Sequence, residues 1–174
     1  KWINIPLLSR THGQAASPST IGKELKVFTT RIDREIKKIS DITPLAKFSG
    51  AVGNYHALDL AVSNIDWIKL TKRFIKNFNV EQNRITTQIE PHDWIAEMLQ
   101  IITRINNISI DLSQDLWIYI SNEIFKLKLN TNEIGSSTMP HKVNPIDFEN
   151  SEGNIGLANS MLNFFAEKLP ISRL

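Results

Sequence analysis

A stretch almost free of helix-breaking residues most constrains how this chain of 174 residues can fold. No glycine lies between Gly53 and Gly135, and Pro91 is the only proline in that interval. After Pro91, apolar side chains recur every three or four residues, as they do on one face of a helix. The stripe consists of Trp94, Met98, Ile101, Ile105, Ile108, Leu112, Leu116, Tyr119, Ile124 and Leu127.

Such a helix would be too long for this chain to bury by itself. About 40 residues at 1.5 Å each would span ~55–60 Å, whereas a compact domain of this size has a radius of ~15 Å. Packing against further copies of the chain, as in a multi-subunit helix bundle, would cover it. The alternative is a break near Asn106–Ser109, which would leave two shorter helices.

Further helices are predicted from apolar periodicity and from capping residues. The first is expected to start near Ser17-Pro18, because serine caps a helix and proline suits its first position. Shorter helices are expected from about Tyr55 to Ser63 and from Asp66 to Asn77, and a last one from about Pro145. We find no convincing strand alternation, so the predicted fold class is all-α.

Composition excludes several classes of protein. The hydrophobic share of 41% is enough for a core, and we treat residues 1–174 as one domain. A net charge of +2, without a basic cluster, gives no case for nucleic acid. No apolar run reaches the ~20 residues of a membrane helix. The chain begins with Lys1 rather than Met, so we expect it to be part of a longer protein.

The histidines do not form a metal site. There are 4 of them and no cysteine, and no two have the i, i+4 spacing of a helical zinc site. Taken singly, His12, His56, His92 and His141 are each more typical of a cap or a surface residue. We therefore expect no metal.

The most polar stretch is GSSTMPHKVNP, from Gly135 to Pro145. It places two hydroxyls and Lys142 just before a predicted helix start, whose free amides favour anions. Such a loop could stabilise an alkoxide or bind a carboxylate. The alternative is an ordinary polar connector between helices.

This stretch resembles the signature loop of the fumarase/aspartase superfamily, G-S-S-x-M-P-x-K-x-N-P, and every fixed position is filled. SRTHGQAASPSTIGKE is similar to the Thr-His motif of the same superfamily. GAVGN, TTQIEPHD and NPIDFENSEGN resemble segments of the bacterial-type adenylosuccinate lyases. The resemblance covers essentially the whole chain, which looks like only the central helical domain of such enzymes, without their N-terminal and C-terminal domains.

The resemblance implies a β-elimination that releases fumarate from adenylosuccinate, giving AMP, and from the related succinyl-aminoimidazole-carboxamide ribotide of purine biosynthesis. It implies a small-molecule substrate, no cofactor and a cytoplasmic location. By motif matching, His12 is the general acid, Ser136 is the base and Glu149 supports the site histidine. The matched substrate-binding residues are Thr11, Gln88, Ser137, Lys142, Asn144 and Asn150. Glu149 and Asn150 could instead solvate a helical turn, and Gln88 could be a loop cap.

The resemblance also implies an assembly. Members of this superfamily form homotetramers whose active sites are completed by residues from three subunits, around a bundle of long helices. We therefore expect residues 1–174 alone to lack full activity. Two alternatives stay open: another lyase of the superfamily, such as an argininosuccinate lyase, or a non-catalytic helical oligomerisation scaffold that has kept the loop.

Overall fold

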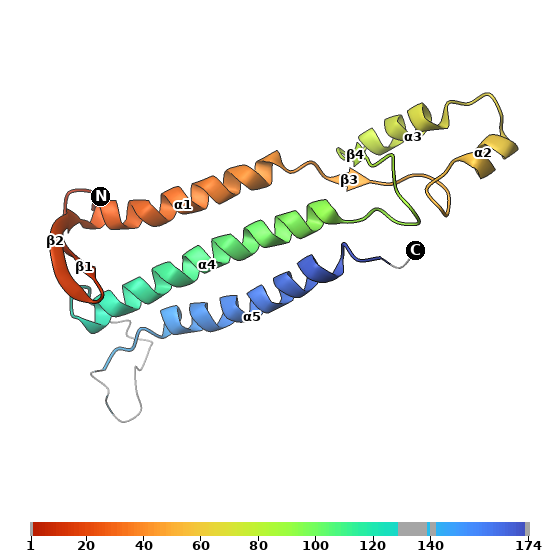
Figure 1. Ribbon diagram of the computed structural model, residues 1–174. Coiled ribbons are helices and arrows are strands. Elements are labelled where there is room, and N and C mark those ends of the chain that lie inside the picture. The colour runs from red at the N-terminus through yellow and green to blue at the C-terminus, as the bar shows by residue number, and fades with distance from the viewer. Residues whose placement is uncertain (1, 129–138, 140–141, 173–174) are drawn as a thin grey trace. The chain divides into compact units, whose positions relative to one another are not determined.

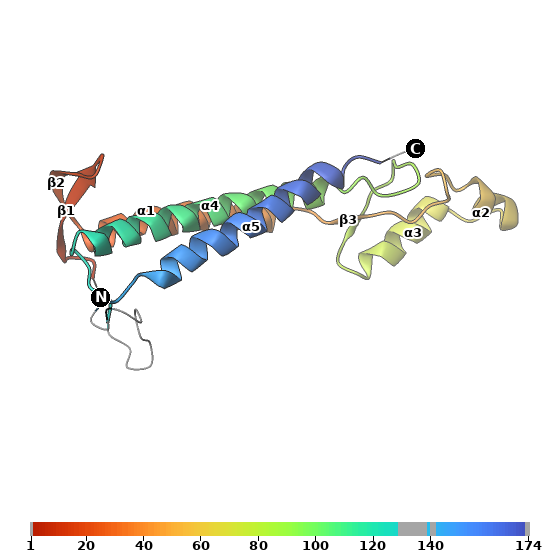
Figure 2. The same ribbon diagram turned by 90° about the horizontal axis from the view of Figure 1, so that it is seen from below.

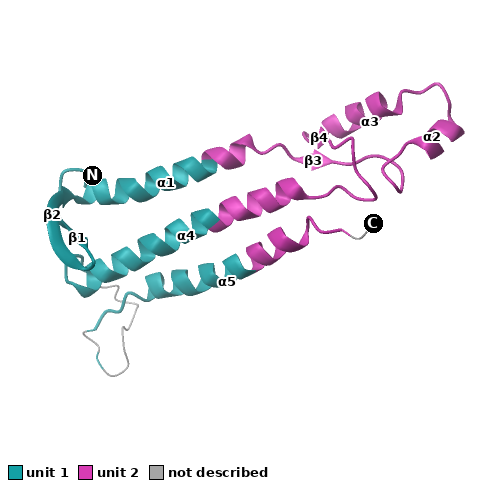
Figure 3. Ribbon diagram, viewed as in Figure 1, with its two compact units in different colours: residues 1–36, 104–160 teal, residues 37–103, 161–174 magenta. Residues whose placement is uncertain are grey.

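The computed structural model describes residues 2–128, 139 and 142–172, and it divides the chain into two compact units. Unit 1 comprises residues 1–36 and 104–160, and unit 2 comprises residues 37–103 and 161–174 (Figure 3). Three long helices each contribute residues to both units. They are α1 (Ile21–Asp41), α4 (Asp93–Ser121) and α5 (Ile146–Lys168).

Within unit 1, these helices pair side by side in alternating directions (Figures 1 and 2). Arg104 Nε donates to Glu35 Oε2 at 2.9 Å, and Arg31 pairs with Asp111. As the residue number rises on α1, its partner's number falls on α4, so the two helices are antiparallel. The hydrogen bonds Trp117–Glu149, Gln114–Glu152 and Asn106–Asn159 show the same relation between α4 and α5.

An antiparallel hairpin precedes α1, which the sequence analysis did not predict. Strand β1 (Pro6–Thr11) pairs with β2 (Gln14–Thr20), with Pro6 opposite Thr20 and Thr11 opposite Gln14. The predicted helix start at Ser17-Pro18 is therefore wrong, since both residues belong to β2. A strand in a two-stranded sheet has a free edge, where proline is tolerated. Thr20 Oγ1 caps α1 instead, accepting from Lys23 N at 3.1 Å.

Within unit 1, the hairpin packs on helices α1 and α4 through a small apolar cluster. Leu7 of β1 and Phe28 of α1 are buried, as is Ile108 of α4. A narrow space between the hairpin, α1 and α4 is lined mostly by apolar and aromatic side chains, with Glu24 and Asp115 at its sides; the others are Leu7, Ile21, Leu25, Phe28, Leu112, Leu116, Tyr119 and Phe125. The apolar stripes of both helices thus provide the surface on which the hairpin rests.

The long helix α4 is continuous through Asn106–Ser109, so the alternative of a break there is wrong. Its 29 residues span about 43 Å, less than predicted. The helix ends because Glu123 is left-handed, with φ 59°, and Ile124 N donates back to Tyr119 O at 2.9 Å. This is a Schellman ending, so Ile124 and Leu127 continue the apolar period without continuing the helix.

Unit 2 contains the two predicted short helices, α2 (His56–Ala61) and α3 (Trp67–Lys76). Asp66 caps α3 by accepting from Lys69 N at 2.9 Å. A short parallel pair, β3 (Leu45–Ala46) with β4 (Glu81–Gln82), joins two loops. Thr71 of α3 is 0% exposed and receives a hydrogen bond from Gln82 Nε2 at 2.7 Å.

Among the residues that the structure describes, large apolar side chains are more often exposed than buried. On α5, Leu157 in unit 1 is 65% exposed and Phe164 in unit 2 is 58% exposed. The prediction that this chain cannot cover its own helices agrees with these exposures. No described helix is both long and apolar enough to span a membrane.

Candidate active site

His12 occupies the tip of the β1–β2 hairpin. Thr11 and Gln14 face each other, so His12 and Gly13 form a two-residue turn. Their φ angles are 53° and 74°, and a type I′ turn requires positive φ at both positions. Histidine is among the few non-glycine residues enriched in this region. The turn therefore presents an exposed imidazole on a short, well-defined support.

The arms of the hairpin are held from two sides. Arg10 Nη1 donates to the carbonyl of Gly13 at 2.8 Å and so braces the turn itself. Ser9 Oγ donates to Glu24 Oε1 on α1 at 2.8 Å. Burial raises the pKa of Glu24, but hydrogen bonds from Ser9 and Lys23 outweigh it and hold that pKa below 4.5. The ionised Glu24 thus stabilises the attachment of the hairpin.

Two other titratable groups near this attachment, Asp115 and Tyr119, have pKa values that shift upward rather than downward. Burial, followed by the charges of Asp111 and Glu24, raises the pKa of Asp115 above 3.8, although Arg31 opposes the shift. Burial, followed by the charges of Glu24 and Asp115, raises the pKa of Tyr119 above 10.0, although Arg10 opposes the shift. At Asp115 and Tyr119 of α4, burial and nearby negative charge therefore favour the neutral form, in contrast to Glu24 of α1.

The start of α5 carries four more of the predicted site residues. Lys142 is exposed, and its backbone N donates to Met139 O at 3.0 Å. Asn144 is half-buried just before Pro145, while Glu149 and Asn150 lie exposed in the early turns of the helix. The predicted helix start near Pro145 is confirmed, since α5 begins at Ile146. Acidic residues in this first turn suit the helix dipole.

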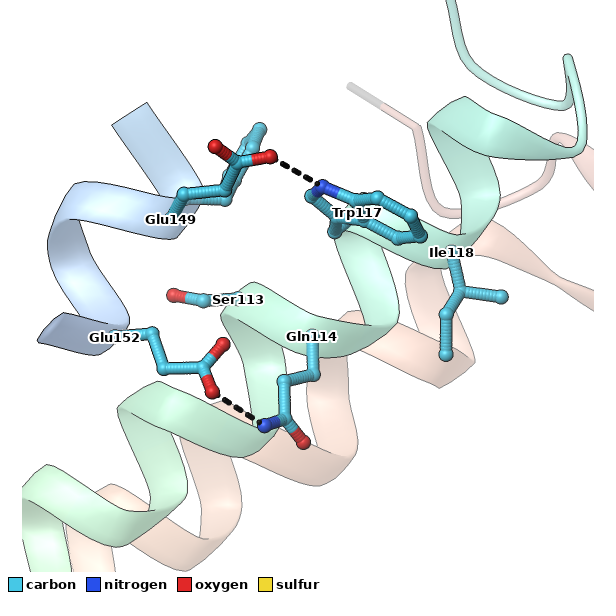
Figure 4. A pocket seen from close by; sticks show the side chains of 7 residues that line it. Ser113, Gln114, Trp117, Ile118, Glu149 and Glu152 are labelled. Atoms are coloured by element: carbon cyan, nitrogen blue, oxygen red, sulfur yellow. Dashed lines mark hydrogen bonds between the residues drawn. The ribbon is translucent and has the colours of Figure 1, made fainter. Parts of the chain in front are cut away.

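Glu149 has a partner that the sequence analysis missed. Trp117 Nε1 donates to Glu149 Oε1 at 3.0 Å, and Gln114 Nε2 donates to Glu152 Oε1 at 3.1 Å (Figure 4). These residues line a cavity of about 410 Å³ between α4 and α5. No spacing in the sequence signals the Trp117–Glu149 pair, because its members lie on different helices and meet only through their register.

Gln88 lies in unit 2, in the loop that follows β4. Its side chain is exposed. The loop closes on Glu90, which is 8% exposed and accepts from Asn83 Nδ2 at 2.9 Å and from His92 N at 2.7 Å. A buried carboxylate therefore ties together the two ends of the segment that presents Gln88.

Unit 1 contains most of the predicted site residues that the structure describes. The β1–β2 hairpin, which carries Thr11 and His12, lies at the same end of unit 1 as the end of α4 and the start of α5 (Figures 1 and 2). Thr11, His12, Lys142, Glu149 and Asn150 are all exposed. Gln88 belongs to the other unit, and Ser136 and Ser137 lie outside the described residues.

The chain is similar to known lyases over nearly its whole length. The family model described as "Lyase" matches residues 1–158. The adenylosuccinate lyase of Vibrio cholerae is 56% identical over 99% of this chain, and that of Escherichia coli K12 is 52% identical over 99%. The adenylosuccinate lyase of Dictyostelium discoideum is 50% identical over 100% of the chain. The chain spans 38% of the length of each of these relatives.

Solved structures show the same fold at lower identity. A class II fumarase from Schistosoma mansoni matches 99% of this chain with a TM-score of 0.66 at 20% identity, over 40% of its own chain. A fumarate lyase:delta crystallin from Brucella melitensis matches 96% with a TM-score of 0.68 at 18% identity, over 38% of its own chain. Both support the helical central-domain fold. The chain belongs to this lyase family, within the fumarase/aspartase superfamily.

Proposed function

We propose that the full-length protein is an adenylosuccinate lyase of purine biosynthesis. The observation that carries the proposal is the identity of 50–56% to adenylosuccinate lyases across residues that include every matched site position. The proposed substrates are adenylosuccinate, which gives AMP and fumarate, and succinyl-aminoimidazole-carboxamide ribotide. A cytoplasmic location and independence from a cofactor belong to the same proposal.

In the proposed reaction, Ser136 removes a proton from the succinyl carbon next to a carboxylate. The electron pair left on that carbon is delocalised into the carboxylate, and it then forms the double bond of fumarate as the carbon–nitrogen bond breaks. His12 protonates the departing nitrogen, which balances the proton taken by Ser136. Thr11, Lys142 and Asn144 hold the succinyl carboxylates, while Gln88, Ser137 and Asn150 contact the rest of the substrate.

The hairpin turn supports the role of His12. General acid catalysis requires a proton donor at a fixed position, and a two-residue turn braced by Arg10 leaves little freedom to the backbone of His12. Glu149 supports the site electrostatically, with its carboxylate oriented by the indole of Trp117. Glu149 is exposed within this chain and can reach further groups through its remaining lone pairs.

The same proposal includes a homotetramer with shared active sites. Two observations support it. All described site residues of unit 1 except the half-buried Asn144 lie open to solvent, whereas a serine base needs a drier surrounding to ionise. Apolar side chains on α5, including Leu157 and Met161, are more than half exposed and would be covered by other subunits.

The test is to assay the full-length protein for fumarate release from adenylosuccinate and, separately, from argininosuccinate. We expect turnover of the first only, and loss of that turnover in Ser136→Ala with the oligomer intact by light scattering. Preference for argininosuccinate would favour the other lyase. Unchanged behaviour of Ser136→Ala would favour a non-catalytic scaffold.

A further inference from the structure

Lys47 links two loops of unit 2 that lie far apart in the sequence. It follows β3 directly, and its ammonium group donates to three backbone carbonyls. Two of these are nearby, the carbonyls of Ser49 at 3.5 Å and Gly50 at 2.9 Å. The third is the carbonyl of Gln88, at 2.7 Å, which is the shortest of the three.

The loop that carries Gln88 is held at both ends by hydrogen bonds that do not involve Lys47. Asn83 N donates to Ala46 O at 2.8 Å, which extends the β3–β4 ladder by one hydrogen bond. At the other end, Glu90 accepts from the side chain of Asn83 and from the backbone of His92. The two ends of the segment between residues 84 and 89 therefore have defined positions.

The middle of this loop packs against the Gly50–Asn54 turn. A Cβ atom on Gly53 would lie 1.9 Å from the carbonyl oxygen of Thr86, so only a glycine permits this approach. Lys47 bonds to the same turn through Gly50 and to the loop through Gln88. One lysine therefore joins the two segments that also meet at Gly53 and Thr86.

A hydrogen bond to the Gln88 carbonyl restrains the backbone from which the Gln88 side chain projects. This carbonyl lies in the peptide plane between residues 88 and 89, so restraining it narrows the range of the ψ dihedral of Gln88. A cationic donor makes the bond stronger than one between neutral groups. The side chain itself stays exposed, so the backbone is held while the amide is presented.

We propose that Lys47 is a positioning residue that orients Gln88 toward the substrate. This inference rests on the proposed function, in which Gln88 is a substrate contact. Lys47 acts through the main chain and does not itself touch the substrate. Replacing Lys47 would therefore weaken substrate binding when the Gln88 side chain is present, and would have no further effect when Gln88 is replaced by alanine.

The experiment is a double-mutant cycle on the full-length protein, with KM and kcat measured for adenylosuccinate. The variants are Lys47→Met, Gln88→Ala and the combination of both, with Lys47→Arg as the conservative variant. Lys69→Met is the matched control, because Lys69 is an exposed lysine of α3 in the same unit. Hydrogen exchange over residues 84–90 reports the order of the loop in each variant.

We expect Lys47→Met to raise KM by about tenfold, the effect of losing one charge-assisted hydrogen bond, with a smaller change in kcat. In the Gln88→Ala background the same substitution should add nothing. Lys47→Arg should restore most of the binding, and Lys69→Met should match the wild type. Hydrogen exchange should quicken in Lys47→Met alone and together with Gln88→Ala.

Two results would overturn the positioning role alone. An unchanged KM in Lys47→Met with faster exchange would mean that the lysine only stabilises the loop. A further rise in KM in the Gln88→Ala background would mean that Lys47 acts on the substrate by another route. Absence of adenylosuccinate turnover in the wild type would instead overturn the proposed function on which this inference rests.

Discussion

The hairpin that presents His12 and the loop that presents Gln88 each hold an exposed side chain in place, but different contacts stabilise their backbones. The hairpin is local: its strands are neighbours in the sequence, and its tip consists of two residues with positive φ. The loop depends on distant partners, since Lys47 contacts Gln88 from 41 positions upstream and Gly53 approaches Thr86 from more than 30 positions upstream. The backbone turn that presents His12 therefore depends mainly on adjacent residues, whereas the position of Gln88 depends on several segments that are distant in the sequence.

The largest expected effect tests the hairpin tip. His12→Asn should lower turnover of the full-length protein by about 10²–10⁴, as expected for loss of a general acid. Asparagine accepts positive φ, so the turn and the melting temperature should be unchanged. His12→Ala should lose the same activity and, in addition, about 1 kcal/mol of stability.

His56→Asn is the control, because His56 starts α2 and is exposed. Single-turnover release of fumarate is the measurement for all three variants. If His12→Asn keeps wild-type turnover, the assignment of the general acid is wrong.

Next in size is the close approach of the two loops in unit 2. Gly53→Ala would place a methyl group against the carbonyl of Thr86 at a residue whose φ is 87°. We expect a loss of up to about 3 kcal/mol in the free energy of unfolding, measured in urea. The Gln88 loop should also become more accessible to protease.

The matched control is Gly156→Ala, where a new Cβ meets no atom within 4 Å. Removing a glycine from a helix should leave stability unchanged or raise it by up to about 1 kcal/mol. Equal destabilisation by both variants would remove the contrast that the close approach predicts.

The buried end of the Gln88 loop should give a smaller effect. Glu90→Gln keeps the size of the side chain but replaces one accepting oxygen with a donor, which faces the backbone N–H of His92 or the amide of Asn83. We expect a loss of about 1–2 kcal/mol in the free energy of unfolding. Glu97→Gln, at an exposed position of α4, should change it little. Equal values for the two variants would contradict a structural role for Glu90.

The smallest effect concerns acid and the hairpin. The pKa of Glu24 is held below 4.5 in the fold, so its contribution is present above pH 4.5 and is lost as the pH falls through the folded pKa. Ser9→Ala removes one of the bonds that lower this pKa and should lose about 0.5–1 kcal/mol near pH 7. The difference from the wild type should shrink under acid conditions, as followed by urea unfolding at several pH values.

Asp115→Asn should change stability with pH in the opposite direction, because the pKa of Asp115 is raised in the fold. The folded pKa of Asp115 is raised above 3.8, so its contribution is favourable only at low pH and is lost as the pH rises through that folded pKa. The variant should therefore be slightly more stable than the wild type near pH 7 and equal to it below pH 3.8. A loss of stability near pH 7 would contradict the raised pKa.

Much of the helical architecture was predictable because periodicity and caps act over a few residues. Asp66 and the apolar spacing of α3 lie within one segment, and Pro145 marks the start of α5. The hairpin was missed because its pairing joins segments that show no alternation of their own, and because Pro18 imitates a helix start. The end of α4 was misplaced because the αL residue there is Glu123 rather than glycine.

In the candidate site, too, some residues were predicted from local sequence and others were found only from tertiary contacts. Motif resemblance named Thr11, His12, Lys142 and Asn144, since a motif is a property of neighbouring letters. It could not name Trp117 as the partner of Glu149, or Lys47 as the partner of Gln88, because both pairs arise from contacts between distant segments.

The sequence alone therefore indicated a mainly helical chain, a long uninterrupted apolar stripe and a polar signature before the last helix, but not the β1–β2 hairpin. Tertiary structure decided which side chains meet. A hydrogen bond across helices or loops depends on register and close backbone approach, and these follow from the packing of whole elements. For that reason the residues that would perform the chemistry could be read from the chain, whereas the residues that hold them in place emerged only from the fold.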